Sequence, residues 1–302
     1  MAAAGDFVFI SCADCSSSSS VILSWKVNSQ TGAITQTSSA SQPIAMWPGT
    51  DPSGKFLYAM SSSVYGFSIN QQTGDLSSLP GSPYSVESAN STAPWISPDG
   101  TWLCTAGFTG PGASPPPDVS CAQRDPSTGA IFTSLGNQVT SGLGPYQGGS
   151  PFVKGNYLLA NTLQSNSSDQ SYSRTGIAVL QIAPSGINAV NTYPGIHGVI
   201  AVDPTGTLVG VSGDDSTLTL LSFNSTSATL TQDAQVTLPQ TPDALTFTCD
   251  GKYLAVSNGS ANTVSVYSVS NNGLQQVGSP VPVTSGASSQ AVAPCPNEVT
   301  PQ

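Results

Sequence analysis

The sequence predicts an all-β fold: a β-propeller of six four-stranded antiparallel blades that forms a single domain over residues 1–302. A strand-like segment recurs six times at a mean spacing of about 49 residues, within the range of propeller repeats. Turn signals stand at regular places around each copy, and no stretch shows helical periodicity. Four short strands per repeat are typical of propeller blades.

The recurring segment is a short apolar strand whose six copies begin at Phe7, Phe56, Trp102, Tyr157, Leu208 and Tyr253. Most copies follow a turn that ends in glycine, such as DPSG at 51–54 and DPTG at 203–206. Glycine suits these tight turns because it adopts positive φ without a Cβ clash. We expect the repeat units at residues 7–55, 56–101, 102–156, 157–207, 208–252 and 253–302. A solenoid of hairpins is the alternative, but the polar end caps that it would need are not visible in the sequence.

The two ends of the sequence favour a closed ring. The segment DFVFIS near the start matches the second strand of a blade, and SSQAVAPC near the end matches the first strand. We therefore expect the C-terminal strand to complete the N-terminal blade, because pairing the two ends in one sheet removes an open edge.

Composition excludes two classes of partner. Only 7% of the residues are charged, and six Lys and Arg stand against sixteen Asp and Glu, giving a net charge of −10. Nucleic acid and anionic lipid bind through clustered cations, so neither is an expected partner. No apolar run reaches the roughly 20 residues that a membrane-spanning helix needs.

The surface is lysine-poor and hydroxyl-rich, and the chain has six cysteines, an even number. This combination favours an extracytoplasmic protein (secreted, periplasmic or at the cell surface), whose leader we expect to be absent from this sequence. Six reduced thiols in a cytosolic protein are the alternative.

The cysteines predict three disulfides. Cys104 and Cys121 lie on the two arms of one hairpin, almost opposite each other. Cys249 and Cys295 end equivalent strands of neighbouring blades, so their bond would lock the ring. Cys12 and Cys15 form a C-x-x-C without a following helix or a second such motif, which favours a local structural disulfide over redox chemistry or zinc.

The pattern P…DPSGKFLYA…V..FSIN..TG.L resembles the lactonase-type β-propeller family, which includes 6-phosphogluconolactonase and the carboxymuconate-lactonizing enzymes. The resemblance covers nearly the whole chain and rests on turn and core positions. It implies a propeller, usually of seven blades, and in the lactonizing members a catalytic cluster of His, Arg and Glu.

The loops of a propeller divide between two faces. The first face holds the turns between strands one and two and between strands three and four of each blade, and the second face holds the other loops. The first face is expected to carry the basic residues Lys26, Lys55, Arg124, Lys154 and Lys252. The second face, where propellers generally bind ligands, is expected to carry Arg174 and His197 with the acidic residues Asp14, Glu87, Asp118, Asp169, Asp214, Asp215 and Asp243.

The candidate catalytic residues are His197 and Arg174, in neighbouring loops of the second face. An imidazole base beside a guanidinium could open a neutral lactone. A sugar phosphate would need more cations than this acidic face supplies, which argues against phosphogluconolactonase activity. In the alternative interpretation His197 only bonds a loop carbonyl and Arg174 pairs with Asp169.

Four further residues are candidate ligand contacts: Asp214, Asp215, Tyr146 and Tyr193. The two aspartates in SGDDST could hold a cation, but the segment lacks the alternating oxygen ligands of a calcium loop, so a solvated turn is the alternative. No metal site and no cofactor are predicted.

The predicted function is that of a non-catalytic extracellular binding or assembly module. Its partners would be other copies of the chain or a cell-surface polysaccharide, and self-association would join unlike faces. The alternative is a hydrolase that opens an uncharged lactone at His197 and Arg174.

Overall fold

The computed structural model describes residues 2–12, 20–28, 31, 33–42, 46–60, 63–86, 94–106, 119–134, 143–144, 151–165, 172–248, 250–270 and 273–283. Six antiparallel sheets follow one another along this part of the chain, which confirms the predicted all-β fold and the number of blades. The chain divides into two compact units, each of which contains three blades. The prediction of a single domain stays a prediction.

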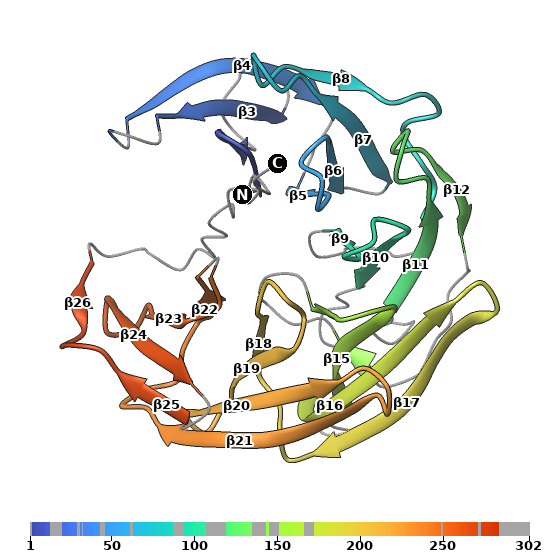
Figure 1. The fold of residues 1–302 in the computed structure, drawn as a ribbon. Coiled ribbons are helices and arrows are strands. Elements are labelled where there is room, and N and C mark those ends of the chain that lie inside the picture. The colour runs from blue at the N-terminus through green and yellow to red at the C-terminus, as the bar shows by residue number, and fades with distance from the viewer. Residues whose placement is uncertain are drawn as a thin grey trace, which may run out of the picture. The chain divides into compact units, whose positions relative to one another are not determined.

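In unit 1 the strands of each blade are paired in sequence order (Figure 1). Blade 1 is built from β1 (Ala2–Ala4), β2 (Phe7–Cys12), β3 (Ser20–Val27) and β4 (Ile34–Gln42). Blade 2 is built from β5 (Met46–Thr50), β6 (Phe56–Met60), β7 (Val64–Ile69) and β8 (Leu76–Ser78). Blade 3 is built from β9 (Trp95–Ile96), β10 (Trp102–Ala106), β11 (Val119–Arg124) and β12 (Ile131–Ser134).

In unit 2 two of the three sheets have a fifth short strand. Blade 4 pairs both β13 (Leu143–Gly144) and β14 (Phe152–Val153) with β15 (Tyr157–Ser165), followed by β16 (Tyr172–Ala183) and β17 (Gly186–Pro194). Blade 5 is built from β18 (Val199–Val202), β19 (Leu208–Ser212), β20 (Thr217–Asn224) and β21 (Thr229–Thr237). Blade 6 has β22 (Ala244–Phe247), β23 (Tyr253–Asn258) and β24 (Thr263–Ser270), and both β25 (Gly273–Gln276) and β26 (Val281–Pro282) pair with β24.

The N-terminal blade differs from the prediction. The sequence predicted that a C-terminal strand supplies its first strand, but Ala2–Ala4 occupies that place and pairs with Phe7–Phe9 of β2. Gly5, at φ 54°, forms the turn between β1 and β2. Three alanines carry little β-propensity, so they gave no strand signal. Residues 284–302, which contain the expected closing strand, lie outside the described residues.

A repeated side-chain contact explains the turn between the first two strands of a blade. The first residue of the turn accepts a hydrogen bond from the N–H five residues later, at the start of the second strand. Oδ1 of Asp51 accepts from Phe56 at 2.9 Å, and Oδ1 of Asp203 accepts from Leu208 at 2.6 Å. The same bond is made by the hydroxyls of Ser97 and Thr248 to Trp102 and Tyr253. Asp, Ser and Thr are interchangeable here because each offers a short side-chain oxygen to the turn.

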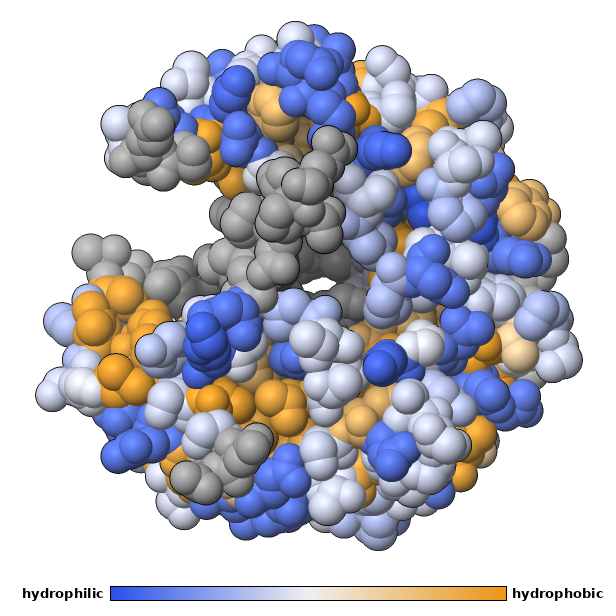
Figure 2. Space-filling model, in the orientation of Figure 1, coloured by the Kyte–Doolittle hydropathy of each residue, from blue (hydrophilic) through white to orange (hydrophobic). Residues whose placement is uncertain are grey.

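Clusters of apolar side chains fill seams between adjacent blades of the same unit. Phe7, Phe9 and Ile22 of blade 1 pack against Leu57 and Phe67 of blade 2. The same kind of core lies between blades 2 and 3 and between blades 5 and 6. On the face turned to the viewer in Figure 2, hydrophilic and intermediate residues predominate, and hydrophobic residues lie in separate groups.

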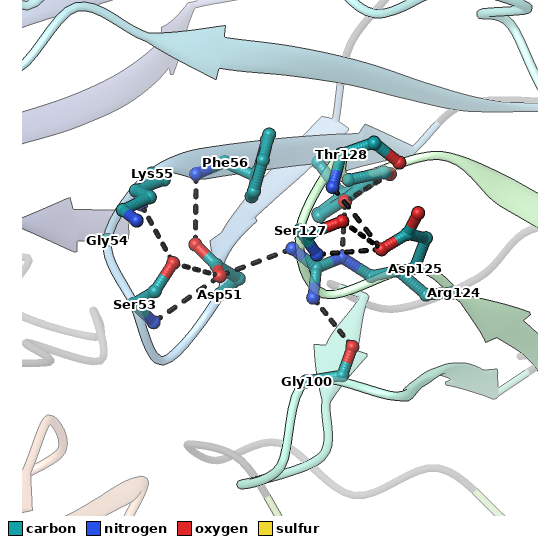
Figure 3. A network of polar contacts seen from close by, with 12 residues as sticks. Asp51, Ser53, Gly54, Lys55, Phe56, Gly100, Arg124, Asp125, Ser127 and Thr128 are labelled. Atoms are coloured by element: carbon teal, nitrogen blue, oxygen red, sulfur yellow. Dashed lines mark hydrogen bonds and ion pairs between the residues drawn. The ribbon is translucent and has the colours of Figure 1, made fainter.

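One seam of unit 1 contains a buried charge. Arg124, whose side chain is fully buried, donates through Nε to the hydroxyl of Tyr58, through Nη1 to the carbonyl of Gly100 at 2.6 Å and through Nη2 to Oδ2 of Asp51 at 3.2 Å (Figure 3). Burial raises the pKa of Tyr58 to about 12, and its hydroxyl donates to the carbonyl of Gly129. The sequence placed Arg124 correctly beside a first-face turn, but it is not one of that face's surface cations.

The position of Arg124 is apolar in every other blade. Its N–H donates to a carbonyl at the start of the second strand, and the same backbone bond is made by Val27, Ile69, Ile182, Phe223 and Val269. Arginine is therefore not required by the blade itself. It ties blade 3 to Asp51 in the turn of blade 2.

We predict that Asp51→Ser destabilises the protein by about 3–5 kcal/mol, because it leaves the buried guanidinium without its counter-charge. Serine keeps the turn, as Ser97 does in blade 3. The double variant Asp51→Ser/Arg124→Ile should recover most of this loss, since it recreates the apolar seam of other blades. Urea unfolding measures both values.

Asp203→Ser is the matched control. Asp203 occupies the same turn position in blade 5, is also buried, and makes no ion pair among the described residues. Its replacement should cost only about 1 kcal/mol. Equal losses for the two single variants would contradict the role assigned to Arg124.

Candidate functional site

The structure brings the two predicted catalytic residues together around one carboxylate. Arg174 lies near the start of β16, His197 in the loop between β17 and β18, and Asp214 in the turn between β19 and β20. By strand order all three belong to the second face. Nη1 of Arg174 lies 3.0 Å from Oδ1 of Asp214, and Nδ1 of His197 lies 3.5 Å from Oδ2 of the same residue. We call these three residues the second-face cluster.

His197 is the single histidine of the chain. Its Nδ1 is buried and makes no hydrogen bond within the described residues, so the contact with Asp214 is an ion-pair distance without hydrogen-bond geometry. The side chain as a whole is 24% exposed. Solvent therefore reaches side-chain atoms other than Nδ1, and Nε2 is the nitrogen left for contact with a ligand.

Asp214 is the most exposed member of the second-face cluster, at 52%, against 28% for Arg174. The guanidinium is therefore paired with a carboxylate that water also reaches. The expected alternative partner of Arg174, Asp169, lies outside the described residues.

Asp215 lies beside the cluster but points to its own turn. Its Oδ1 accepts hydrogen bonds from the hydroxyl of Thr217 at 2.7 Å and from the Thr217 N–H at 3.1 Å. These bonds, with a smaller contribution from His197, lower the pKa of Asp215. Asp215 thus stays ionised and adds negative charge next to the cluster.

The backbone beside His197 is held by a residue that the sequence analysis missed. Asn161, fully buried in the middle of β15, accepts the N–H of Gly198 through Oδ1 and donates to the carbonyl of Gly198 through Nδ2, both at 3.0 Å. This bidentate contact joins blade 4 to the loop that leads into blade 5. A polar side chain at the end of the apolar strand YLLAN was the available signal.

Hydroxyl and amide groups extend the polar surface from the cluster toward blade 6. Thr241 donates to the carbonyl of Asp214 at 3.3 Å and shares a hydrogen bond with the hydroxyl of Ser216 at 3.1 Å. Nδ2 of Asn258 donates to the carbonyl of Thr241, and Ser260 donates to the side chains of Asn258 and Gln240. The second face of unit 2 therefore has connected hydroxyl and amide groups with the charged cluster at one side. Asp243, one of the acidic residues expected on this face, lies among them and accepts the N–H of Gly259.

The two predicted tyrosine contacts have different outcomes. The hydroxyl of Tyr193 accepts the N–H of Leu230 at 2.7 Å, so it joins β17 of blade 4 to β21 of blade 5. The structure thus gives Tyr193 a tie between two blades. Tyr146 lies outside the described residues.

One predicted disulfide is confirmed. Cys104 of β10 and Cys121 of β11 are bonded, with their Cα atoms 4.0 Å apart and both side chains buried. The predicted pairs Cys12–Cys15 and Cys249–Cys295 fall on residues that are not described with their side chains.

The described residues contain neither a metal-binding group nor a membrane-spanning helix. Among the described residues, no group of three or more His, Cys, Asp or Glu side chains could hold a metal ion. No helix in the same ranges is long and apolar enough to span a membrane. Of the acidic residues expected on the second face, Asp14, Glu87 and Asp118 lie outside these ranges.

No family model and no curated protein sequence matches the chain. Many solved structures are similar to it, including the following three. A protein from Lactobacillus plantarum is 16% identical over 92% of this chain and 82% of its own, with a TM-score of 0.60. Hydrazine synthase of Kuenenia stuttgartiensis is 18% identical over 89% and 82%, with a TM-score of 0.58. A candidate 6-phosphogluconolactonase of Bacteroides uniformis is 16% identical over 92% and 97%, with a TM-score of 0.50.

These matches confirm the resemblance to lactonase-type β-propellers at the level of the fold. At such identities the likeness shows the fold alone. One of these similar structures is named a hydrazine synthase and another a candidate 6-phosphogluconolactonase, so a similar fold does not define one activity. The function of this chain must therefore be argued from its own residues.

Proposed function

We propose that the chain is an extracytoplasmic module that binds an uncharged, hydroxyl-rich ligand of the polysaccharide class and does not turn it over. The observation that carries this proposal is the second-face cluster of Arg174, His197 and Asp214 within a connected network of hydroxyl and amide groups. The binding surface is the second face of unit 2.

The chemistry of this surface suits sugar hydroxyls. Hydroxyl and amide side chains both donate and accept hydrogen bonds, as sugar hydroxyls do. A carboxylate or a guanidinium strengthens such bonds, because hydrogen bonds to charged groups are worth more than those between neutral groups. Asp214 keeps half of its side chain in solvent, so it has room to accept a ligand hydroxyl while it holds Arg174.

The charge of the surface favours an uncharged ligand. Arg174 contributes one positive charge, and Asp214 and Asp215 contribute two negative charges, so these three side chains are together net negative. An anionic sugar would be repelled by this field. The same argument disfavours a phosphorylated lactone.

The disulfide supports a location outside the cytoplasm. Disulfides such as Cys104–Cys121 persist in oxidising compartments and are rare in the cytosol. Association between copies of the chain, which was the other part of the sequence-based hypothesis, stays a prediction.

We predict that cellohexaose, a neutral oligosaccharide, perturbs the single imidazole signal of His197 in an NMR titration. A galacturonate hexamer should bind about tenfold more weakly, a difference of about 1.4 kcal/mol in binding free energy, because the surface is net negative.

Arg174→Ala should weaken cellohexaose binding. Lys252→Ala, which removes an exposed cation beside a first-face turn, is the control and should leave it unchanged. Equal or tighter binding of the uronate, or no response of His197 to either sugar, would contradict the proposal.

Hydrolysis of an uncharged lactone is a second candidate, and the contact between His197 and Asp214 favours it. In this reaction Nε2 of His197 takes a proton from water while the water oxygen attacks the lactone carbonyl. Arg174 would stabilise the oxyanion that forms. Collapse breaks the ring C–O bond, and the leaving alkoxide takes the proton from the imidazolium, so that water and lactone give one hydroxy acid.

Activity on D-glucono-δ-lactone, measured against its spontaneous hydrolysis, separates the two functions. If the chain is a hydrolase, His197→Ala should reduce the catalysed rate by about 10²–10⁴-fold, the usual contribution of a positioned base. If the chain only binds, neither protein should exceed the spontaneous rate. Turnover that is equal in the two proteins would remove His197 from the reaction.

A further inference from the structure

Asn161 holds a backbone segment of the next blade rather than its own. Its amide makes two hydrogen bonds to Gly198, one as acceptor and one as donor, across the seam between blades 4 and 5. The side chain is fully buried, so water does not compete for these bonds. The bonds fix the peptide groups on both sides of Gly198, and the one on its N-terminal side belongs to His197.

The fold does not need asparagine at this position. Asn161 is the fifth residue of the strand that begins at Tyr157, and the fifth residues of the equivalent strands in blades 5 and 6 are Ser212 and Ser257. Ser212 is buried, and its hydroxyl makes no hydrogen bond within the described residues. Two blades of the same unit are therefore complete with a serine that makes no such contact.

Gly198 is also specific to this seam. Its φ is +136°, and a Cβ there would lie 1.7 Å from the carbonyl oxygen of Ser212. The equivalent residue before blade 6, next to Ala244, is Asp243, which has a side chain. The loop that carries His197 thus has a backbone shape at Gly198 that only glycine permits.

We propose that Asn161 is a positioning residue for His197. By clamping Gly198 it holds the imidazole next to Asp214, so the ligand meets a histidine that is already in place. Ordering the loop in the free protein removes an entropic cost that binding would otherwise carry. This inference rests on the proposed function only for the claim that His197 contacts the ligand. The clamp itself can be tested without a ligand.

Asn161→Ser is the test, because it gives blade 4 the residue that blades 5 and 6 already have. We expect the variant to fold with a lowered melting temperature, because the N–H and the carbonyl of Gly198 lose their buried partners. The NMR signal of the single imidazole should shift or broaden, since the loop at 195–198 is released. Affinity for cellohexaose should fall about tenfold, or, if the chain is a hydrolase, its rate on D-glucono-δ-lactone should fall about tenfold or more.

Asn191→Ser is the matched control. Asn191 lies on β17 of blade 4 and donates through Nδ2 to the carbonyl of Ala228 in blade 5, at 2.8 Å. The variant makes the same chemical change and removes one hydrogen bond across the same seam, but between β17 and the turn that joins β20 to β21. It should leave the imidazole signal and ligand affinity unchanged.

Each outcome decides the inference. An unaltered imidazole signal in Asn161→Ser, or an equal change in Asn191→Ser, would overturn it. A variant that fails to fold would overturn it too, because asparagine would then be needed for the blade. If the signal changes while the unmodified protein binds neither cellohexaose nor the lactone, the clamp stands and the proposed function fails.

Discussion

The structure depends on the covering of one blade by the next. Apolar side chains fill the seams between blades 1 and 2, blades 2 and 3, and blades 5 and 6, so a polar group buried in a seam is costly unless it finds a partner there. Two seams meet this condition in different ways. Between blades 2 and 3 a buried arginine reaches the turn aspartate of the preceding blade, and between blades 4 and 5 a buried asparagine holds the backbone of the following loop. The positions equivalent to Arg124 in the other blades have apolar side chains, and those equivalent to Asn161 in blades 5 and 6 have serines whose hydroxyls make no hydrogen bond within the described part of the chain.

The candidate site follows from the second of these seams. Blade 4 supplies Arg174 and Asn161, the connecting loop supplies His197, and blade 5 supplies Asp214. A cation and an imidazole from different segments share one carboxylate, which draws the loop and the turn together at the end of the seam. Surface ion pairs of this exposure contribute little to stability on their own. The clamp on Gly198 is buried, so it is the contact that fixes the geometry, and the exposed groups are left available for a ligand.

The sequence predicted the features that depend on residues close together in the chain. Turn residues and strand length depend on neighbours in the chain, so six blades, the Cys104–Cys121 hairpin and the approach of Arg174 to His197 could be read from repeats. The first strand of blade 1 was missed because three alanines carry no β signal. The role of Arg124 was missed because its partner Asp51 lies 73 residues away, and that of Asn161 because its partner is a backbone group 37 residues away, which leaves no mark in the composition of either segment. Contacts across seams depend on tertiary packing, and a single sequence does not encode them as patterns.

The central claim is that a buried side chain of blade 4 fixes the loop that presents His197. Amide hydrogen exchange at Gly198 in the unmodified protein tests it most directly, because this N–H is donated only to a side chain and not to a strand partner. The account predicts slow exchange, similar to that of amides within β19, since opening requires the seam to separate. Exchange of the Gly198 amide at the rate of an unstructured peptide would contradict it.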